Sequence, residues 1–338
     1  MRYIHLSLAL ILVSVLFFWS TPASAQVTLL IPAKPDITVL TKAKKEVKPK
    51  ERQTKPTPKG TPEKKGEKLP ETKDSAKPAT PSANGTVATS PKKVDELAKP
   101  VIDEETDVLI TMMEPFAHKG LAMDRPQSFT VLYFNQGQPK KDGHLVPERL
   151  DLLGDVEEIL YLGQRAWGAN VGIDHPGLYQ FLMETKPWWN EREQKFVQHL
   201  VKVMMPVLGQ AAGWDEAAGL SLEIVPQTRP FGLLAPTLFT GKVLANGQPL
   251  ADHLVYLGRI NTDGQKVPTS WHETSVAKTN HEGLFSFAIN KAGWWYCLAP
   301  IAGAPLKGAD GQPKELELAT IFWFYADNIS GTTDRKSY

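Results

Sequence analysis

Cysteine is nearly absent from this sequence. Cys297 is the single cysteine among 338 residues, so no disulfide can form within one chain and the fold has to rely on its hydrophobic cores. Cys297 directly follows the aromatic run Trp294-Trp295-Tyr296. An apolar setting of this kind predicts a buried, unreactive thiol rather than a nucleophile.

The sequence also lacks the common catalytic motifs. It has no Gly-x-Ser-x-Gly nucleophile elbow and no glycine-rich loop that would cradle a phosphate. Carboxylate pairs such as Asp215-Glu216 occur, but adjacency in sequence does not place two carboxylates across a scissile bond. We therefore expect a protein without enzymatic activity.

Long hydrophobic runs are missing as well, apart from one near the N-terminus. Leu6 to Trp19 is a nearly unbroken apolar run that follows Arg2 and precedes the cleavage signal Ala23-Ser24-Ala25. The run is shorter than the roughly 20 residues that span a bilayer. Residues 1–25 therefore resemble a secretory signal peptide. Together with the scarcity of cysteine this indicates a bacterial periplasmic protein; an uncleaved N-terminal anchor is the alternative.

Aromatic residues are absent between Thr41 and Pro100, where the chain consists mainly of Lys, Pro, Glu, Thr and Ala. Such a composition buries too little apolar surface to offset the entropy of ordering, so residues 33–106 are expected to form a disordered linker. Residues 41–100 carry 16 Lys and Arg against 8 Asp and Glu, whereas residues 101–338 carry 20 against 28. The basic linker is either a solvated spacer or a contact to an anionic envelope surface. Without aromatic side chains to stack on bases, nucleic acid is not an expected partner.

The sequence after the linker consists of short segments of strand character, separated by turns that contain Gly, Pro and Asn. The fold is therefore expected to be all-β. We expect a short strand at 26–32 whose partners lie far downstream, an immunoglobulin-like β-sandwich at 107–230, a second sandwich at 231–326 and a disordered tail at 327–338. A Pro-Gly turn that leads into Tyr179-x-Phe181 supports the first sandwich. Segments 128–134, 177–184 and 254–259 are each expected to form a strand, and Asn246-Gly247 a tight turn. Lys195 to Val207 suits either a helix or a strand, and its β-branched residues favour a strand.

Several ordered motifs in the second half are similar to those of the DUF4198 family and, at the C-terminus, to the transthyretin-like or carboxypeptidase-regulatory-like sandwich. The motifs are Lys195-Phe196-x-x-His199, Gly213-Trp214-Asp215-Glu216, Arg229-Pro230-Phe231-Gly232, Asn246-Gly247-Gln248-Pro249, Asn280-His281-Glu282-Gly283 and Gly293-Trp294-Trp295. The resemblance covers about Asp107 to Tyr325. It implies an exported bacterial protein that serves as a periplasmic component of nickel and cobalt uptake, with an energy-coupling membrane transporter as its partner.

Four residues are candidate metal ligands under this resemblance: Glu114, His118, Met123 and His199. Ni²⁺ and Co²⁺ accept imidazole and carboxylate ligands. Each residue also has a purely structural interpretation: Glu114 and His118 as exposed loop residues, Met123 as core, and His199 as a partly buried histidine with a satisfied hydrogen bond. Family members commonly carry a His at the mature N-terminus and His-Pro-Phe-Glu in the first loop. Here Gln26 and Glu114-Pro115-Phe116-Ala117 stand at those places.

The paired tryptophans support a different interpretation. Trp188, Trp189, Trp214, Trp294 and Trp295 could stack on sugars, although packing at the junction of the two sandwiches is the favoured interpretation. The alternative function is therefore a cell-envelope adhesion or scaffold protein that binds a polysaccharide or another protein. Nickel or cobalt uptake remains the leading expectation, and apart from these ions no cofactor is expected.

Overall fold

The computed structural model describes residues 26–38 and 102–329, and nearly all regular structure in this part is β-strand. The predicted signal peptide, most of the predicted linker and residues 330–338 of the predicted tail lie outside these residues. The last strand ends at Asn328, so it extends into the tail predicted at 327–338. No helix within the described part has the length and apolar character needed to cross a membrane. The strand that begins at Glu104 overlaps the predicted linker, so the linker ends before the expected residue 106.

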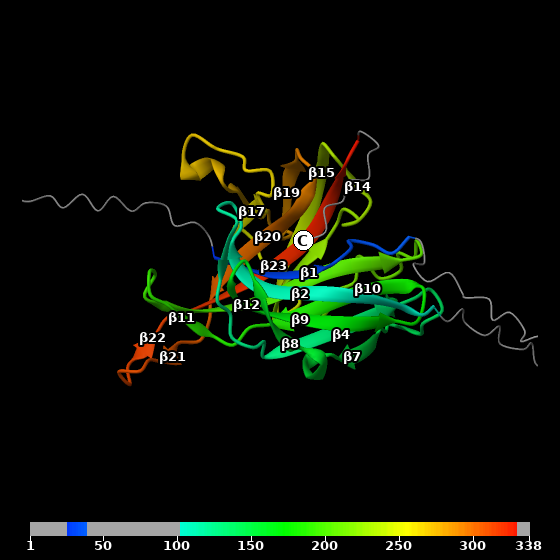
Figure 1. Cartoon of the computed structure of the whole chain (residues 1–338). Coiled ribbons are helices and arrows are strands. Elements are labelled where there is room, and N and C mark those ends of the chain that lie inside the picture. The colour runs from blue at the N-terminus through cyan, green and yellow to red at the C-terminus, as the bar shows by residue number, and fades with distance from the viewer. Residues whose placement is uncertain (1–25, 39–101, 330–338) are drawn as a thin grey trace, which may run out of the picture. The chain divides into compact units, whose positions relative to one another are not determined.

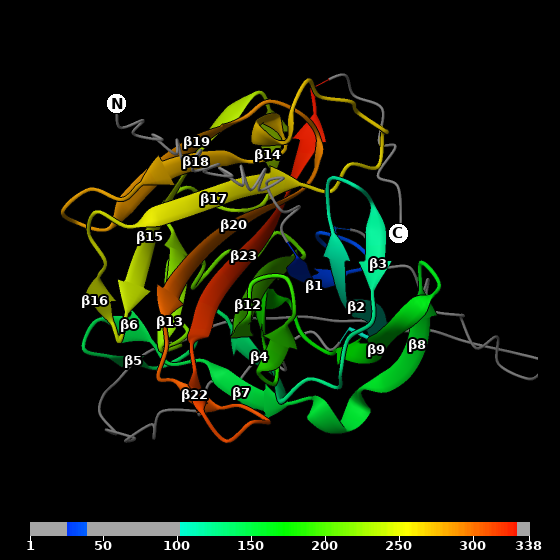
Figure 2. The ribbon, with the colours of Figure 1, turned by 90° about the vertical axis from the view of Figure 1, so that its left-hand side faces the viewer.

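Three sheets make up most of the fold (Figures 1 and 2). The first sheet contains β1 (Val27–Pro32), β2 (Glu104–Glu114), β3 (Lys119–Leu121), β8 (Glu157–Tyr161) and β9 (Gln164–Ile173). The second contains β4 (Ser128–Phe134), β7 (Glu148–Asp151), β10 (Gly177–Glu184), β11 (Trp188–Asn190), β12 (Lys195–Val207), β14 (Leu233–Ala235), β17 (Leu254–Arg259), β18 (Ser275–Lys278), β20 (Gly293–Ala302) and β23 (Leu316–Asn328). The third contains β13 (Leu222–Pro226), β15 (Thr237–Ala245), β16 (Gln248–Pro249) and β19 (Leu284–Ile289).

Two small hairpins and two short 3-10 helices complete the described part. The hairpins pair β5 (Lys140–Lys141) with β6 (His144–Leu145) and β21 (Leu306–Lys307) with β22 (Pro313–Lys314). The 3-10 helices are η1 (Leu153–Asp155) and η2 (Ser270–His272). Of these elements only η2 bears on the candidate site described below.

The ten-stranded second sheet is the central layer, because it packs against a different sheet on each face. Side chains on a strand alternate between the two faces, and β12 shows this directly. Val201 and Val203 belong to the core shared with the first sheet, whereas Leu200 and Met204 belong to the core shared with the third sheet. The expected all-β sandwich fold is therefore confirmed, and the two sandwiches share the central sheet.

Strands from both halves of the chain meet in the middle of this sheet. β12 pairs with β23 in parallel, in a register that runs from Phe196 opposite Leu316 to Val203 opposite Trp323. The predicted border between residues 230 and 231 falls between β13 and β14, yet hydrogen bonds of the central sheet connect the two sides of that border. All described residues belong to one compact unit.

Local sequence patterns define many strand limits. The segments expected from periodicity at 128–134, 177–184, 195–207 and 254–259 correspond to β4, β10, β12 and β17 without a shift. The tight turn predicted at Asn246-Gly247 joins β15 to β16, and both residues have positive φ, 48° and 75°. Asn and Gly tolerate this left-handed conformation, which a two-residue hairpin turn requires. The N-terminal strand β1 pairs with β2, far downstream as expected.

One buried ion pair links the central sheet to the third sheet. Lys202 on β12 and Glu223 on β13 are almost completely buried, with Nζ 2.5 Å from Oε1. The Glu223 carboxylate also accepts hydrogen bonds from the backbone N–H groups of Ala218 and Gly219, at 2.7 and 3.0 Å. Buried charges are tolerated only when they are paired and hydrogen-bonded. This pair therefore fixes the loop between β12 and β13 against the sheet.

Removal of the two partners should have unequal effects on stability. Glu223→Ala leaves a buried ammonium group and several N–H groups without partners, and should lower the free energy of unfolding by about 3–5 kcal/mol. Lys202→Met should cost less, because the Glu223 carboxylate keeps its backbone donors. Urea unfolding measures both values. Asp124→Ala, which removes an exposed ion pair with Arg165, is the control and should change stability by less than about 1 kcal/mol. A larger loss in Lys202→Met than in Glu223→Ala would contradict this account.

Candidate functional site

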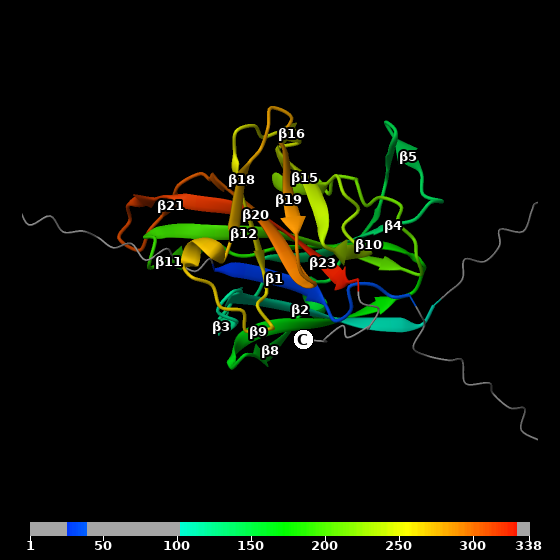
Figure 3. The ribbon, with the colours of Figure 1, turned by 90° about the horizontal axis from the view of Figure 1, so that it is seen from above.

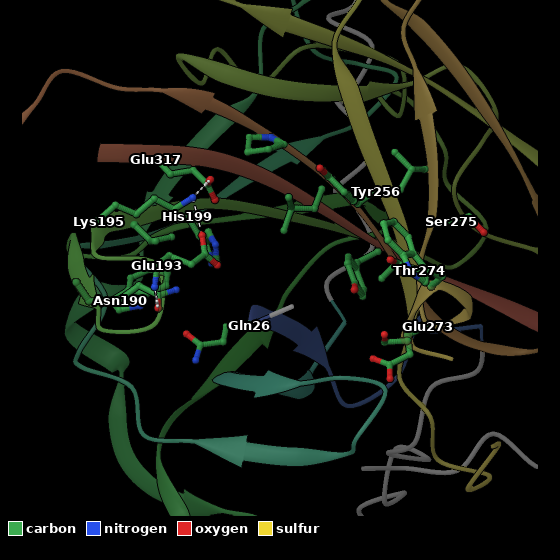
Figure 4. A pocket seen from close by; sticks show the side chains of 18 residues that line it. Gln26, Asn190, Glu193, Lys195, His199, Tyr256, Glu273, Thr274, Ser275 and Glu317 are labelled. Atoms are coloured by element: carbon green, nitrogen blue, oxygen red, sulfur yellow. Dashed lines mark hydrogen bonds and ion pairs between the residues drawn. The ribbon is translucent and has the colours of Figure 1, made fainter. Parts of the chain in front are cut away.

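A cavity of about 810 Å³ opens beside His199. Its wall combines residues from β11, β12, β17, β18, β20, β23 and the η2 segment, together with Gln26 just before β1. Figure 4 shows His199, Lys195, Glu193 and Glu317 on one side, Tyr256, Glu273 and Thr274 on the other, and Gln26 between them. Cavities of this size that mix aromatic side chains with a few polar groups are typical of small-molecule sites.

His199 is the most deeply buried polar residue of the cavity wall, with 2% of its surface exposed. Its Nδ1 lies 2.7 Å from Thr28 Oγ1 on β1, and its backbone N–H donates to Thr185 Oγ1 at 2.9 Å. The Trp188 ring meets the imidazole edge-on at 4.8 Å between ring centroids. Burial lowers the pKa of His199 to about 3. The imidazole is therefore neutral at physiological pH and its orientation is fixed.

Lys195 lies between two carboxylates on the same side of the cavity. Its Nζ is 2.6 Å from Glu193 Oε2 and 2.6 Å from Glu317 Oε2. Burial alone would lower the pKa of Lys195, but the hydrogen bonds to both carboxylates outweigh it and the net shift is upward. This side of the cavity thus presents hydrogen-bond donors and acceptors in a fixed arrangement.

The opposite side is aromatic and contains more exposed residues. Trp271 in η2 is 80% exposed, and Tyr256 on β17 is half-buried. Glu273, Thr274 and Ser275 follow Trp271 along the same wall. An exposed indole at the edge of a cavity can lie flat against an apolar ligand face, while the neighbouring hydroxyl and carboxylate groups bind its polar edge.

The four predicted metal ligands occupy different environments. Glu114 ends β2 and its carboxylate lies 4.0 Å from Arg192; His118 is exposed in a turn with φ of 48°. The Met123 side chain is in the core shared by the first and central sheets. Of the four, His199 alone lines the cavity. Within residues 26–38 and 102–329 no group of three or more His, Cys, Asp or Glu side chains is arranged to hold a metal ion.

The tryptophans divide between core and cavity. Trp294 and Trp295 are buried in the two cores, and Trp189 packs edge-on against Phe196. Trp188 lines the cavity. Trp271 and Tyr256 were not predicted as site residues, because Trp271 lies in a segment without strand or helix periodicity and Tyr256 lies on a strand with ordinary alternation. One signal in the sequence could have identified Trp271: a single Trp between Ser270 and His272, outside any apolar run, is a candidate for an exposed binding residue.

His199 should make stability depend on pH. Its folded-state pKa of about 3 lies below the ordinary value of 6.5, so the unfolded chain binds a proton that the folded chain does not. The contribution of the neutral imidazole is complete above about pH 6.5 and is lost as pH falls toward 3. The urea midpoint should therefore drop between pH 7 and pH 5.5, and less so in His199→Gln. His118→Gln, at an exposed site, should keep the wild-type dependence; identical pH profiles for all three proteins would refute the assignment.

Comparisons with known proteins locate the chain in a family. No curated protein matches this chain in sequence. Among solved structures, the D0-D1 domain of intimin is 12% identical, with 66% of this chain and 91% of that chain covered and a TM-score of 0.19. BcpA, the major pilin subunit of Bacillus cereus, is 11% identical, with 66% and 65% covered and a TM-score of 0.14. The family model for a domain of unknown function, DUF4198, matches residues 95–303. This match spans more than half of the sequence, and the chain therefore belongs to the DUF4198 family.

Proposed function

We propose that this chain is a non-enzymatic binding protein of the bacterial cell envelope that holds a saccharide in the cavity beside His199. The observation that carries the proposal is the composition of the cavity: an exposed indole and a phenol face a fixed row of imidazole, ammonium and carboxylate groups across about 810 Å³. A volume of this size fits a ligand of drug-like dimensions.

A saccharide has the two kinds of surface that this cavity complements. The C–H face of a sugar ring packs on Trp271 or Tyr256, whereas its hydroxyl groups donate to Glu317 and Glu193 or accept from Lys195. Hydrogen bonds to charged groups are the stronger ones, at about 1.5–3 kcal/mol each. The ligand thus gains orientation from the charged row and contact area from the aromatic wall.

Export to the periplasm and retention at the envelope belong to the same proposal. The apolar N-terminal run with its cleavage signal and the basic stretch between Thr41 and Pro100 support them. A basic segment is attracted to anionic envelope surfaces, and a saccharide site on the same chain would give a second point of attachment. The protein would then act as an envelope adhesion or scaffold component.

Substitution of the exposed indole tests the saccharide site. Trp271→Ala should weaken binding of envelope-derived oligosaccharides by about tenfold, because a stacked aromatic ring contributes about 1.4 kcal/mol. Calorimetric titration against peptidoglycan fragments and common polysaccharide fragments measures the affinity. The matched control is Leu160→Ala, which removes an equally exposed apolar side chain on β8, outside this cavity. Absence of binding across the panel, or equal weakening in both variants, would refute the proposal.

A role in nickel or cobalt uptake is the second candidate. The neutral imidazole of His199 supports it, because imidazole binds a metal ion in its unprotonated form. Glu193 and Glu317 line the same cavity, and carboxylates are acceptable partners for these ions. Both carboxylates are engaged by Lys195, so a bound cation would have to compete with the ammonium group. The ion would be cargo for a membrane transporter of the energy-coupling type.

Titration with Ni²⁺ and Co²⁺ separates the two candidates. If the cavity binds a metal ion, Glu317→Gln and His199→Gln should each weaken the binding of Ni²⁺ and Co²⁺ by roughly tenfold or more. Each substitution would remove either a metal ligand or a group that orients one. His118→Gln should leave the affinity unchanged, since His118 is exposed in a separate turn. Dissociation constants above roughly 1 mM, where binding is worth only about 4 kcal/mol, would rule out metal carriage.

A further inference from the structure

β1 is a separate strand that the remainder of the described chain encloses. All six of its residues, Val27 to Pro32, are buried. Each one pairs with β2 in an antiparallel register that runs from Val27 opposite Met113 to Pro32 opposite Val108. β1 also contacts β12 and β23 of the central sheet, and Figure 3 shows it between β2 and β12. A groove formed by β2, β12 and β23 therefore holds this strand.

Polar contacts fix the strand within the groove. The Thr28 carbonyl accepts from Trp323 Nε1 at 2.9 Å, and the Thr28 hydroxyl pairs with His199 Nδ1; both contacts are buried. Further along, Ala33 N–H donates to Asp107 O at 2.7 Å and Ile37 N–H to Pro206 O at 3.0 Å. These partners come from β2, β12 and β23, or from residues directly beside them. Residues 26–38 thus bind the remainder of the protein as an extended peptide ligand would.

The connection between β1 and β2 is unusually long. Residues 39–101, a stretch of 63, separate the two described parts of the chain. At 3.3 Å per residue this stretch can span at most about 200 Å, which is ample for reaching a neighbouring molecule. The covalent link raises the effective concentration of the chain's own strand, but this effect falls as the number of linking residues grows. The covalent link therefore favours the strand of the same chain without making it the sole possible occupant.

We infer that the groove between β2, β12 and β23 is a strand-acceptor site, and that β1 of a second copy of this chain can replace the chain's own β1. Exchange of an identical element between copies leaves every native contact intact. Without β1, the groove would expose an unpaired edge of β2 and an apolar surface. Both features favour the binding of another strand in its place. Copies held at high local density, as at an envelope surface, would thereby become linked.

The exchange would also join two copies at the cavity. Gln26 directly precedes β1 and lines the cavity, and Thr28 holds the His199 imidazole. In an exchanged pair, the partner copy would supply the residue at position 26 and the hydroxyl group that orients His199. The cavity would thus be complete only when the groove is filled. The inference itself rests on the β1 contacts and stands whether or not the cavity binds a saccharide.

A specific protease site inserted between Gly60 and Thr61 of the full chain tests the inference. After cleavage, the N-terminal fragment should remain bound on size exclusion. A fluorescent synthetic peptide of residues 26–38 should then displace it, detected by fluorescence anisotropy, with brief exposure to mild denaturant to speed exchange. A peptide with Leu30→Asp should compete at least about 100-fold less well, because it buries an unpaired carboxylate. The matched control is Lys34→Ala at an exposed position, which should compete within about threefold of the unchanged peptide.

The uncleaved chain provides a second measurement. Two differently tagged versions, refolded together at roughly 1 mM, should yield mixed dimers, whereas refolding at roughly 1 µM should yield monomers. Fragment retention without peptide uptake, equal uptake of the Leu30→Asp peptide, or failure of mixed dimers to form at high concentration would each overturn the inference.

Discussion

The structure depends on a central sheet that is covered on both faces. β12 and β23 lie side by side in its middle, and from His199 to Val207 every β12 residue is buried. Such strands need apolar side chains on both faces, so the alternation that marks a half-exposed strand is lost. The one charge buried there, Lys202, is tolerated because Glu223 neutralises it. Both sandwiches are built on these two strands, and neither core would close without them.

The same strand connects folding with the candidate site. His199 stands on β12 with its backbone in the sheet, its Nδ1 on Thr28 of β1 and one ring face against Trp188. Two consecutive strands, β11 and β12, and the sequence-distant β1 therefore determine the orientation of one imidazole. Burial keeps that imidazole uncharged, and the charged residues Lys195, Glu193 and Glu317 gather next to it. Strands of the central sheet therefore form most of the cavity wall, and the segment around η2, which carries Trp271, forms much of the opposite side.

The sequence predicted individual strands better than their assembly. Segments such as 128–134 and 254–259 show their limits through local alternation and flanking turns, and these limits agree with the structure. The parallel pairing of β12 with β23 joins residues about 120 positions apart, and no local pattern encodes it. For that reason a shared central sheet was not anticipated. Of the site, His199 was selected through the family resemblance, whereas Trp271 gains its meaning only from its position across the cavity.

Hydrogen exchange with and without a bound oligosaccharide is the decisive measurement of whether the cavity beside His199 is the ligand site. If it is, amide exchange should slow in the cavity wall, at residues 188–199 and 270–276, with no change on β8 at the far edge of the first sheet. Protection confined to β8, or to the groove lined by Asp107, Asp155 and Glu157, would contradict it.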